Sequence, residues 1–211
     1  MRNYFFQNPF WISWLYPGAV WKVMTNKKEL FLTFDDGPHP VVTPYVLAQL
    51  RTYQAKATFF CLGSAMEANQ EVVKQINDDG HLIGNHTQSH LNGWATKTYQ
   101  YMADVLACQT LQDEYSNDRL FRPPYGNLKL GQLRALKKAG YRIIMWSHLS
   151  GDFDRELDRK QSLDYMKKAD PGSILVFHDS EKAFKNLKEM LPRVLEHFST
   201  LGYSFKTLSN L

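Results

Sequence analysis

The chain is organised around the stretch Leu30-Phe31-Leu32-Thr33-Phe34-Asp35-Asp36-Gly37-Pro38, or LFLTFDDGP. Its first five residues form an apolar run of strand length, which ends in two adjacent carboxylates and a Gly-Pro turn. A short apolar run bounded by turn residues is typical of a buried strand. Because an unpaired carboxylate is costly to bury, Asp35 and Asp36 are expected to be solvated, paired or bound to a cation. A turn in which one Asp caps the next element is the structural alternative.

Strand-like and helix-like segments alternate along the rest of the chain. The predicted strands cover residues 30–34, 56–62, 81–84, 120–121, 141–146 and 173–177, and residues 203–208 are a candidate for closing the sheet. Polar residues able to do chemistry come just after these strands, namely Asp35, Asp36, His86, His90, Arg122, Asp152 and His178. Alternation at this short spacing favours a parallel sheet or a (β/α) barrel, in which such positions meet at one face. The sequence therefore predicts an α/β fold with one site at the carboxyl ends of its strands.

The composition is that of an ordinary globular protein. The 211 residues are 44% hydrophobic and 22% charged, which suits one domain with a substantial core. The net charge of +4 is mild and scattered, so nucleic acid is not an expected partner. Cys61 and Cys108 form no CxxC motif and are expected to be buried free thiols.

The N-terminal part, residues 1–27, is rich in aromatic residues. We expect it to be an extension packed on the domain of residues 28–211, and we expect a monomer. It has neither a signal-peptide pattern nor an apolar stretch long enough to span a bilayer, so no transmembrane span and a cytoplasmic location are predicted. Peripheral contact of the aromatic residues with a membrane, and hence association with the envelope, is the alternative.

His86 and His90 are four residues apart, so on a helical turn both imidazoles would face one side. A chance pair is the structural alternative, but the surrounding residues are polar and loop-like. Two imidazoles and one carboxylate, with Asp36 as the third ligand, leave an open position for water, as a catalytic Zn²⁺ site requires. Asp35 would then be free to take a proton from that water.

His178 and Arg122 each have a functional and a structural interpretation. His178 follows an apolar run and is either a core histidine with one hydrogen bond or a proton donor to a leaving group. Arg122 is either an ordinary surface residue or, in a pocket, the partner of a carboxylate. The backbone N–H of Tyr125, in the turn after Arg122, could donate to a developing oxyanion.

Five motifs in order give the chain a family resemblance: TFDDGP (33–38), HTQSH (86–90), RPPYG (122–126), a Trp-then-Asp segment (146–154) and LVFHD (175–179). This series resembles the polysaccharide deacetylases of the NodB-homology class, carbohydrate esterase family 4, over roughly residues 28–208. The resemblance implies a distorted, incomplete (β/α) barrel of the NodB-homology type. It also implies metal-dependent hydrolysis of acetyl groups, usually N-acetyl, on a glycan.

The resemblance also implies a role for each matching residue. The catalytic roles are the base (Asp35), the residue that orients the base (Arg122), the oxyanion donor (the Tyr125 amide) and the general acid (His178). The implied metal ligands are Asp36, His86 and His90, and the expected substrate-binding residues are Pro124, Tyr125, Phe153 and Val176. Metal-bound water would attack the acetamide carbonyl with help from Asp35, and His178 would protonate the departing amine.

The fourth motif departs from the family pattern DxxDW, because Leu149, Asp152 and Phe153 stand at its three defined positions. The second carboxylate, Asp152, is kept and is implied to pair with Arg122. We therefore expect Arg122 and Asp152 together to support Asp35, as part of the catalytic set. The changed residues Leu149 and Phe153 are expected to alter the pocket wall and the substrate.

The expected activity is metal-dependent de-N-acetylation of an amino-sugar polymer or oligomer, which is hydrolysis of a non-peptide carbon–nitrogen bond. Zn²⁺ is the expected cofactor, with Co²⁺, Ni²⁺ or Mn²⁺ as alternatives. The expected partner is an acetylated glycan. Three other functions stay open at this point: O-acetyl esterase activity on a glycan such as xylan, hydrolysis of a small non-glycan amide, and glycan binding by a pseudoenzyme.

Overall fold

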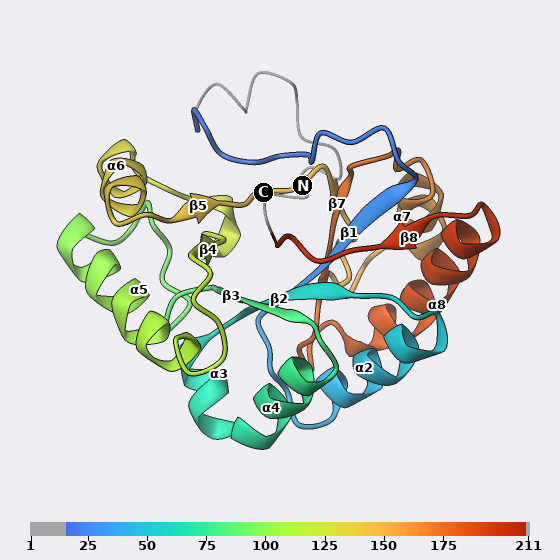
Figure 1. Ribbon diagram of the computed structural model, residues 1–211, viewed down its shortest axis with the longest axis horizontal. Helices are drawn as coiled ribbons and strands as arrows, with labels where there is room; N and C mark the ends of the chain where they lie inside the picture. The colour runs from blue at the N-terminus through green and yellow to red at the C-terminus, as the bar shows by residue number, and fades with distance from the viewer. Residues whose placement is uncertain (1–15, 210–211) are drawn as a thin grey trace.

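A computed structural model describes residues 16–209 and shows a curved sheet with helices around its outer side (Figure 1). The strands are β1 Glu29–Asp35, β2 Ala57–Cys61, β3 Leu82–Asn85, β4 Leu120–Phe121, β5 Arg142–Ile143, β6 His148–Leu149, β7 Ile174–His178 and β8 Ser204–Phe205. The α-helices are α2 Val42–Thr52, α3 Gly63–Ala68, α4 Gln70–Asp78, α5 Thr98–Gln112, α6 Leu130–Lys138, α7 Arg159–Met166 and α8 Phe184–Thr200, and η1 Pro124–Gly126 is a 3₁₀ turn.

The sheet is parallel and runs in the order β5-β4-β3-β2-β1-β7-β6, while β8 pairs with the start of β1. Because β5 and β6 stand at the two ends of this order, the sheet is a curled but incomplete barrel. This confirms the predicted fold class. The strand exits consequently meet at one end of the molecule, as in other parallel α/β folds.

The segment before β1 contacts residues next to two strands, β5 and β7. Val20 forms a bridge with Ile144, just after β5, and Lys22 forms a bridge with Ser173, just before β7. Most of the aromatic extension that is predicted to pack on the domain, residues 1–15, lies outside the described part of the chain. Among residues 16–209, no helix has the length and apolar character needed to cross a membrane.

Strand β1 shows why the sequence folds this way. Its residues from Leu30 to Asp35 are all buried, because helices cover its outer face and the barrel interior covers the other. Leu30, Leu32 and Phe34 pack in the outer core with α2 and α8. With a side-chain period of two, Thr33 and Asp35 fall on the opposite face, which lines the interior. The alternation therefore directs the Asp35 carboxylate into the barrel.

Some details of the secondary structure differ from the sequence prediction, among them strand β5, which covers only Arg142–Ile143 of the predicted residues 141–146. The strand β6 lies where a loop was expected, and it has only two residues, too few to show a periodic pattern. A proline inside a helix predicts a kink or a restart, but helix α8 continues through Pro192 without a restart. Its buried face, which includes Leu187, Leu191 and Val194, packs on both sides of the proline and holds the helix together. The two cysteines are buried and free, as predicted.

His81 should make the fold sensitive to acid. The side chain is 7% exposed and its Nδ1 accepts a hydrogen bond from the Ala57 N–H, 3.2 Å away. Burial, helped by nearby Lys56, lowers the pKa of His81 to about 4. An unfolded chain binds this proton below about pH 6.5, so stability is fully present above that pH and is lost as the pH falls towards 4. The loss is on the order of 3 kcal/mol.

The test is urea unfolding of the wild type and His81→Asn at pH 7 and pH 4.5. The Asn side-chain oxygen can accept the same hydrogen bond but does not titrate in this range. We expect the free energy of unfolding to fall less between the two pH values in the variant. An equal fall in both proteins would contradict this role of His81.

Candidate active site

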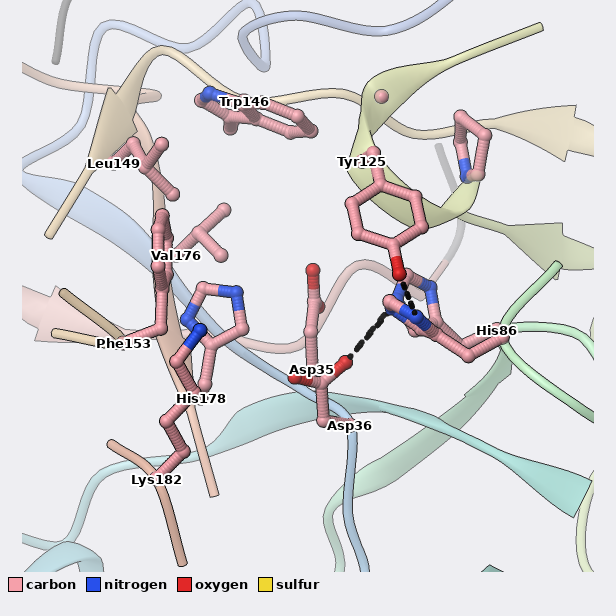
Figure 2. A pocket seen from close by; sticks show the side chains of 13 residues that line it. Asp35, Asp36, His86, Tyr125, Trp146, Leu149, Phe153, Val176, His178 and Lys182 are labelled. Carbon is pink, nitrogen blue, oxygen red and sulfur yellow. Dashed lines mark hydrogen bonds and ion pairs between the residues drawn. The ribbon is translucent and has the colours of Figure 1, made fainter. Parts of the chain in front are cut away.

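A pocket of about 500 Å³ opens at the carboxyl ends of the strands (Figure 2). It is lined by Asp35, Asp36, His86, His90, Pro123, Tyr125, Gly126, Trp146, Leu149, Phe153, Val176, His178 and Lys182. The structure thus brings together residues from the first, second, third, fourth and fifth sequence motifs. Arg122 and Asp152 are fully buried and contact pocket residues from behind.

Left-handed backbone conformations gather at this pocket. Asp36, His90 and Tyr125 have φ values of 78°, 56° and 58°, and Thr87 between the two histidines has 70°. Such conformations are unfavourable for residues other than glycine and persist where the surrounding structure fixes them. At Asp36 this conformation follows the end of β1, so that Asp35 and Asp36, although consecutive, reach different partners.

Asp36, His86 and His90 form a compact cluster, here called the DHH cluster, whose ligand atoms lie within 4.8 Å of one another. The Oδ1 atom of Asp36 is 3.6 Å from Nε2 of His86 and 3.2 Å from Nε2 of His90. Nδ1 of His86 lies 2.8 Å from the Arg122 carbonyl oxygen, so this nitrogen carries the proton. The lone pair of His86 is therefore on Nε2, which faces Asp36.

The charge state of the DHH cluster also suits a cation. Burial lowers the pKa of His86 to about 4, so this imidazole is neutral at neutral pH. Burial by itself would raise the pKa of Asp36, but the adjacent His90 and the charges of His178 and His86 outweigh it and lower that pKa. Asp36 Oδ1 is buried and accepts no hydrogen bond within the described part of the chain.

These donors fit a divalent metal ion. One anionic carboxylate oxygen without a hydrogen bond and two imidazole nitrogens converge on one point, and such a mixed N/O set is typical of zinc and related ions. Nδ1 of His90 lies 3.1 Å from the Tyr125 hydroxyl, and Nδ1 of His86 is held by a carbonyl. Such outer hydrogen bonds orient metal-binding imidazoles.

Asp35 is held by Arg122 across the barrel interior. The Nη1 group of Arg122 donates to Oδ1 of Asp35 at 2.8 Å and to the Thr33 hydroxyl at 2.7 Å, and Nη2 donates to the Met145 carbonyl at 2.9 Å. The guanidinium lies 4.2 Å from the centre of the Phe60 ring. A fully buried arginine needs such partners, since an unpaired charge there is strongly unfavourable. Asp35 is thus fixed in orientation at the edge of the pocket.

The prediction that Asp152 pairs with Arg122 is wrong. Asp152 binds His178 instead: Oδ1 is 2.7 Å from Nδ1 of His178, and Oδ2 accepts the His178 backbone N–H at 2.9 Å. The strand order explains the difference, because Asp152 follows β6, which neighbours β7 and its terminal His178, whereas Arg122 follows β4 on the far side of β1. Arg122 still has a carboxylate partner, but that partner is Asp35 itself.

The environment of His178 favours its protonated form. Burial alone would lower the pKa of this imidazole, but the charge and hydrogen bond of Asp152, with further help from Asp36 and Asp35, raise it to about 9. The proton on Nδ1 is shared with Asp152, so Nε2 is the nitrogen available to the pocket. His178 is therefore not a core histidine with a single hydrogen bond, because it lines the pocket.

One wall of the pocket is apolar. Val176 on β7 and Leu149 on β6 are register neighbours, and Trp146 and Phe153 extend this wall (Figure 2). The Phe153 ring meets the His178 ring edge-on at 4.9 Å. The prediction of Pro124 as a lining residue is off by one position: Pro123 lines the pocket, while Pro124 is buried at the start of η1.

Tyr125 stands at the pocket rim with 63% of its surface exposed. Its ring packs edge-on against His90 at 4.6 Å. Within the described chain, its backbone N–H has no hydrogen-bond partner, so it is free to donate to a ligand. The left-handed φ of 58° breaks the regular geometry of η1 at this residue.

Sequence reasoning missed Pro123, Gly126, Trp146 and Lys182 as pocket residues. Lys182 comes four residues after His178, in the turn between β7 and α8. The other site residues were identified because they follow predicted strands closely, and Lys182 could have been identified in the same way. A lone lysine beside Glu181 gives no motif, however, and it was not distinguished from the other surface lysines.

The fold and the site define an α/β half-barrel protein whose charged pocket residues gather at the carboxyl ends of a parallel sheet. A family model described as polysaccharide deacetylase matches residues 22–144. A peptidoglycan-N-acetylglucosamine deacetylase of Bacillus cereus is 34% identical over 196 residues, which are 92% of each chain. A chitooligosaccharide deacetylase of Azorhizobium caulinodans is 33% identical over 165 residues, covering 77% of this chain and 79% of that one.

The similarity extends to three dimensions. The crystal structure of the Bc1960 peptidoglycan N-acetylglucosamine deacetylase superposes with a TM-score of 0.86 at 29% identity, covering 95% of both chains. The chain therefore belongs to the polysaccharide deacetylase family.

Proposed function

We propose that this protein is a metal-dependent deacetylase that removes N-acetyl groups from an amino-sugar polysaccharide or oligosaccharide. The proposal rests on one observation, which is that three groups line the same pocket. These are the DHH cluster, the carboxylate of Asp35 with its Arg122 partner, and the imidazole of His178 with its Asp152 partner. Several relatives support the substrate class, among them deacetylases of peptidoglycan and of chitooligosaccharides.

The DHH cluster would hold one divalent cation, with Zn²⁺ as the first candidate and Co²⁺, Ni²⁺ or Mn²⁺ as alternatives. When bound, such an ion acts as a Lewis acid and lowers the pKa of water at the site. The neutral state of His86 and the anionic state of Asp36 mean that these ligands need not lose a proton at neutral pH.

The residues around the cluster divide the proton transfers. Asp35, held by Arg122, would take a proton from the attacking water. The Tyr125 N–H would donate to the oxygen that becomes negative in the transition state. His178, protonated through its bond to Asp152, would give a proton to the departing amine nitrogen. The apolar wall of Val176, Leu149 and Trp146 would receive the acetyl methyl group.

Acetate and free amine release from a panel of substrates tests this function. The panel contains chitooligosaccharides, peptidoglycan fragments and acetylxylan, and the protein is loaded with Zn²⁺. We expect acetate and primary amine to appear in equal amounts from the N-acetylated glycans. Acetate from acetylxylan alone would identify an O-acetyl esterase. No acetate from any substrate, with metal bound, would overturn the proposal in favour of a binding protein.

The Asp152–His178 pair predicts a specific pH dependence. A general acid must be protonated, so turnover should fall as the pH rises through the pKa of His178. Because Asp152 raises that pKa, Asp152→Asn should move the alkaline fall of kcat to lower pH by about 1–3 units. The measurement is kcat against pH on one N-acetylated substrate.

Asp158→Asn is the matched control for this pH shift. Asp158 caps helix α7 on the loop that follows Asp152, with its side chain accepting from the Gln161 N–H, and Asn is an equally good cap. This variant loses the same charge without contacting His178 and should keep the wild-type profile. An alkaline limb that does not move in Asp152→Asn would contradict the role of this pair.

A further inference from the structure

Lys182 differs from the other charged residues that line the pocket. Each of the others contacts an oppositely charged or hydrogen-bonding group of the site, as described above. Within the described residues, no ion pair or hydrogen bond joins the Lys182 ammonium to another group. Its nitrogen lies 5.5 Å from the centre of the Phe153 ring, and the side chain is exposed. The pocket therefore contains a cation that is available to a ligand.

Lys182 lies on the side of the pocket where the amine nitrogen of the substrate would be protonated. Lys182 lies beside Phe153 and His178, on the side of the pocket away from His86 and Tyr125 (Figure 2). The Phe153 ring lies next to both His178 and the Lys182 ammonium, which places this ammonium on the same side of the pocket as the imidazole. If His178 protonates the amine, the sugar carbon that bears this nitrogen must lie on the same side. A long substituent on one of the two neighbouring sugar carbons can then extend towards Lys182.

An ammonium group in this position selects for negative charge. A carboxylate on a carbon next to the acetamido group could form a charge-assisted hydrogen bond with Lys182. A hydroxyl group at the same place would gain much less. The other charged residues of the pocket already form ion pairs or hydrogen bonds within the site. Lys182 is therefore the group best able to distinguish an acidic sugar from a neutral one.

We infer that Lys182 binds a carboxylate carried by the sugar next to its acetamido group, and that the site therefore favours N-acetylated amino sugars with an acidic ether substituent. The inference rests on the proposed deacetylase function and specifies its substrate class. A lactyl ether, as in N-acetylmuramic acid, has the required chemistry, whereas a chitooligosaccharide has no such carboxylate.

The experiment compares kcat/KM for acetate release from two substrates of equal length. One is tetra-N-acetylchitotetraose, here called chitotetraose, and the other is a peptide-free tetrasaccharide of alternating N-acetylglucosamine and N-acetylmuramic acid with free lactyl carboxylates. The variants are Lys182→Met, which keeps an apolar stem, and Lys182→Arg, which keeps the charge. Lys185→Met is the matched control, because Lys185 is exposed on α8 and does not line the pocket.

Lys182→Met should lower kcat/KM for the acidic substrate about threefold to tenfold, mainly through KM, as expected for a partly exposed charged hydrogen bond. The loss on chitotetraose should be much smaller than the loss on the acidic substrate, and Lys182→Arg should restore most of the latter. The difference between substrates should shrink at high salt, because screening weakens an exposed ion pair.

An equal effect on both substrates, or no effect on either, would overturn the inference, and so would the same loss in Lys185→Met. These outcomes are distinct from failure of the proposed function. In that case the wild-type protein would release acetate from neither tetrasaccharide.

Discussion

Asp35→Asn is expected to lower the rate of acetate release about 10²–10⁴-fold, the usual contribution of a positioned acid or base. The amide cannot take a proton from water at neutral pH. Its side-chain oxygen can still accept the Arg122 Nη1 hydrogen bond now made by Asp35 at 2.8 Å, so the barrel interior should stay intact. Asp35 is not in the DHH cluster, so the variant should bind metal as the wild type does.

The measurement combines initial rates on an N-acetylated glycan with metal content and thermal unfolding of the same sample. Metal content and thermal unfolding show whether a loss of activity comes from the missing base, from loss of the metal or from loss of the folded structure. Wild-type activity in Asp35→Asn on a verified substrate would show that the base assignment is wrong.

His86→Ala is expected to abolish activity by removing the metal itself. His86 is 2% exposed, and its Nε2 faces Asp36 while Nδ1 is held by the Arg122 carbonyl. Loss of a mere outer partner of a metal ligand costs about 10–100-fold in affinity, so loss of a ligand should cost at least that much. The variant should therefore contain little metal after dialysis and should bind added Zn²⁺ only weakly.

His197→Ala is the control, since this histidine lies on α8 and does not line the pocket. Metal content is measured after dialysis, and affinity is measured by titration with Zn²⁺. Tight binding of one metal ion per chain by His86→Ala would exclude His86 as a ligand and with it the DHH cluster as the metal site.

The fold was predictable because its strands carry strong local signals. The run at residues 30–34 is apolar, bounded by turn residues and buried on both faces, which is the pattern of a central parallel strand. The two-residue strand β6 carried no such signal. Its place depends on pairing with β7, a contact between residues distant in the sequence. The continuation of α8 through Pro192 likewise depends on tertiary packing.

The positions of the site residues were predictable, but their partners were not. Parallel strands bring their exits together, and that rule is enough to place Asp35, Asp36, His86 and His178 in one pocket. Pairing is a matter of strand order, which the sequence does not state. The pairing of Asp152 with Arg122 was carried over from the family resemblance, and the structure differs because β6, which precedes Asp152, neighbours β7 and not β4. Lys182 was missed because a lone lysine forms no motif, and the absence of a hydrogen-bond or ion-pair partner in the described structure is not visible in the sequence.

A metal ion at the DHH cluster is, we propose, needed for hydrolysis of an N-acetyl group. The most direct test is to strip the protein with a chelator, return Zn²⁺ in graded amounts and measure acetate release from chitotetraose at each step. We expect no release without metal, a rise in proportion to added Zn²⁺ that stops at one ion per chain, and no recovery in His86→Ala. Full acetate release from the stripped wild-type protein would contradict the claim.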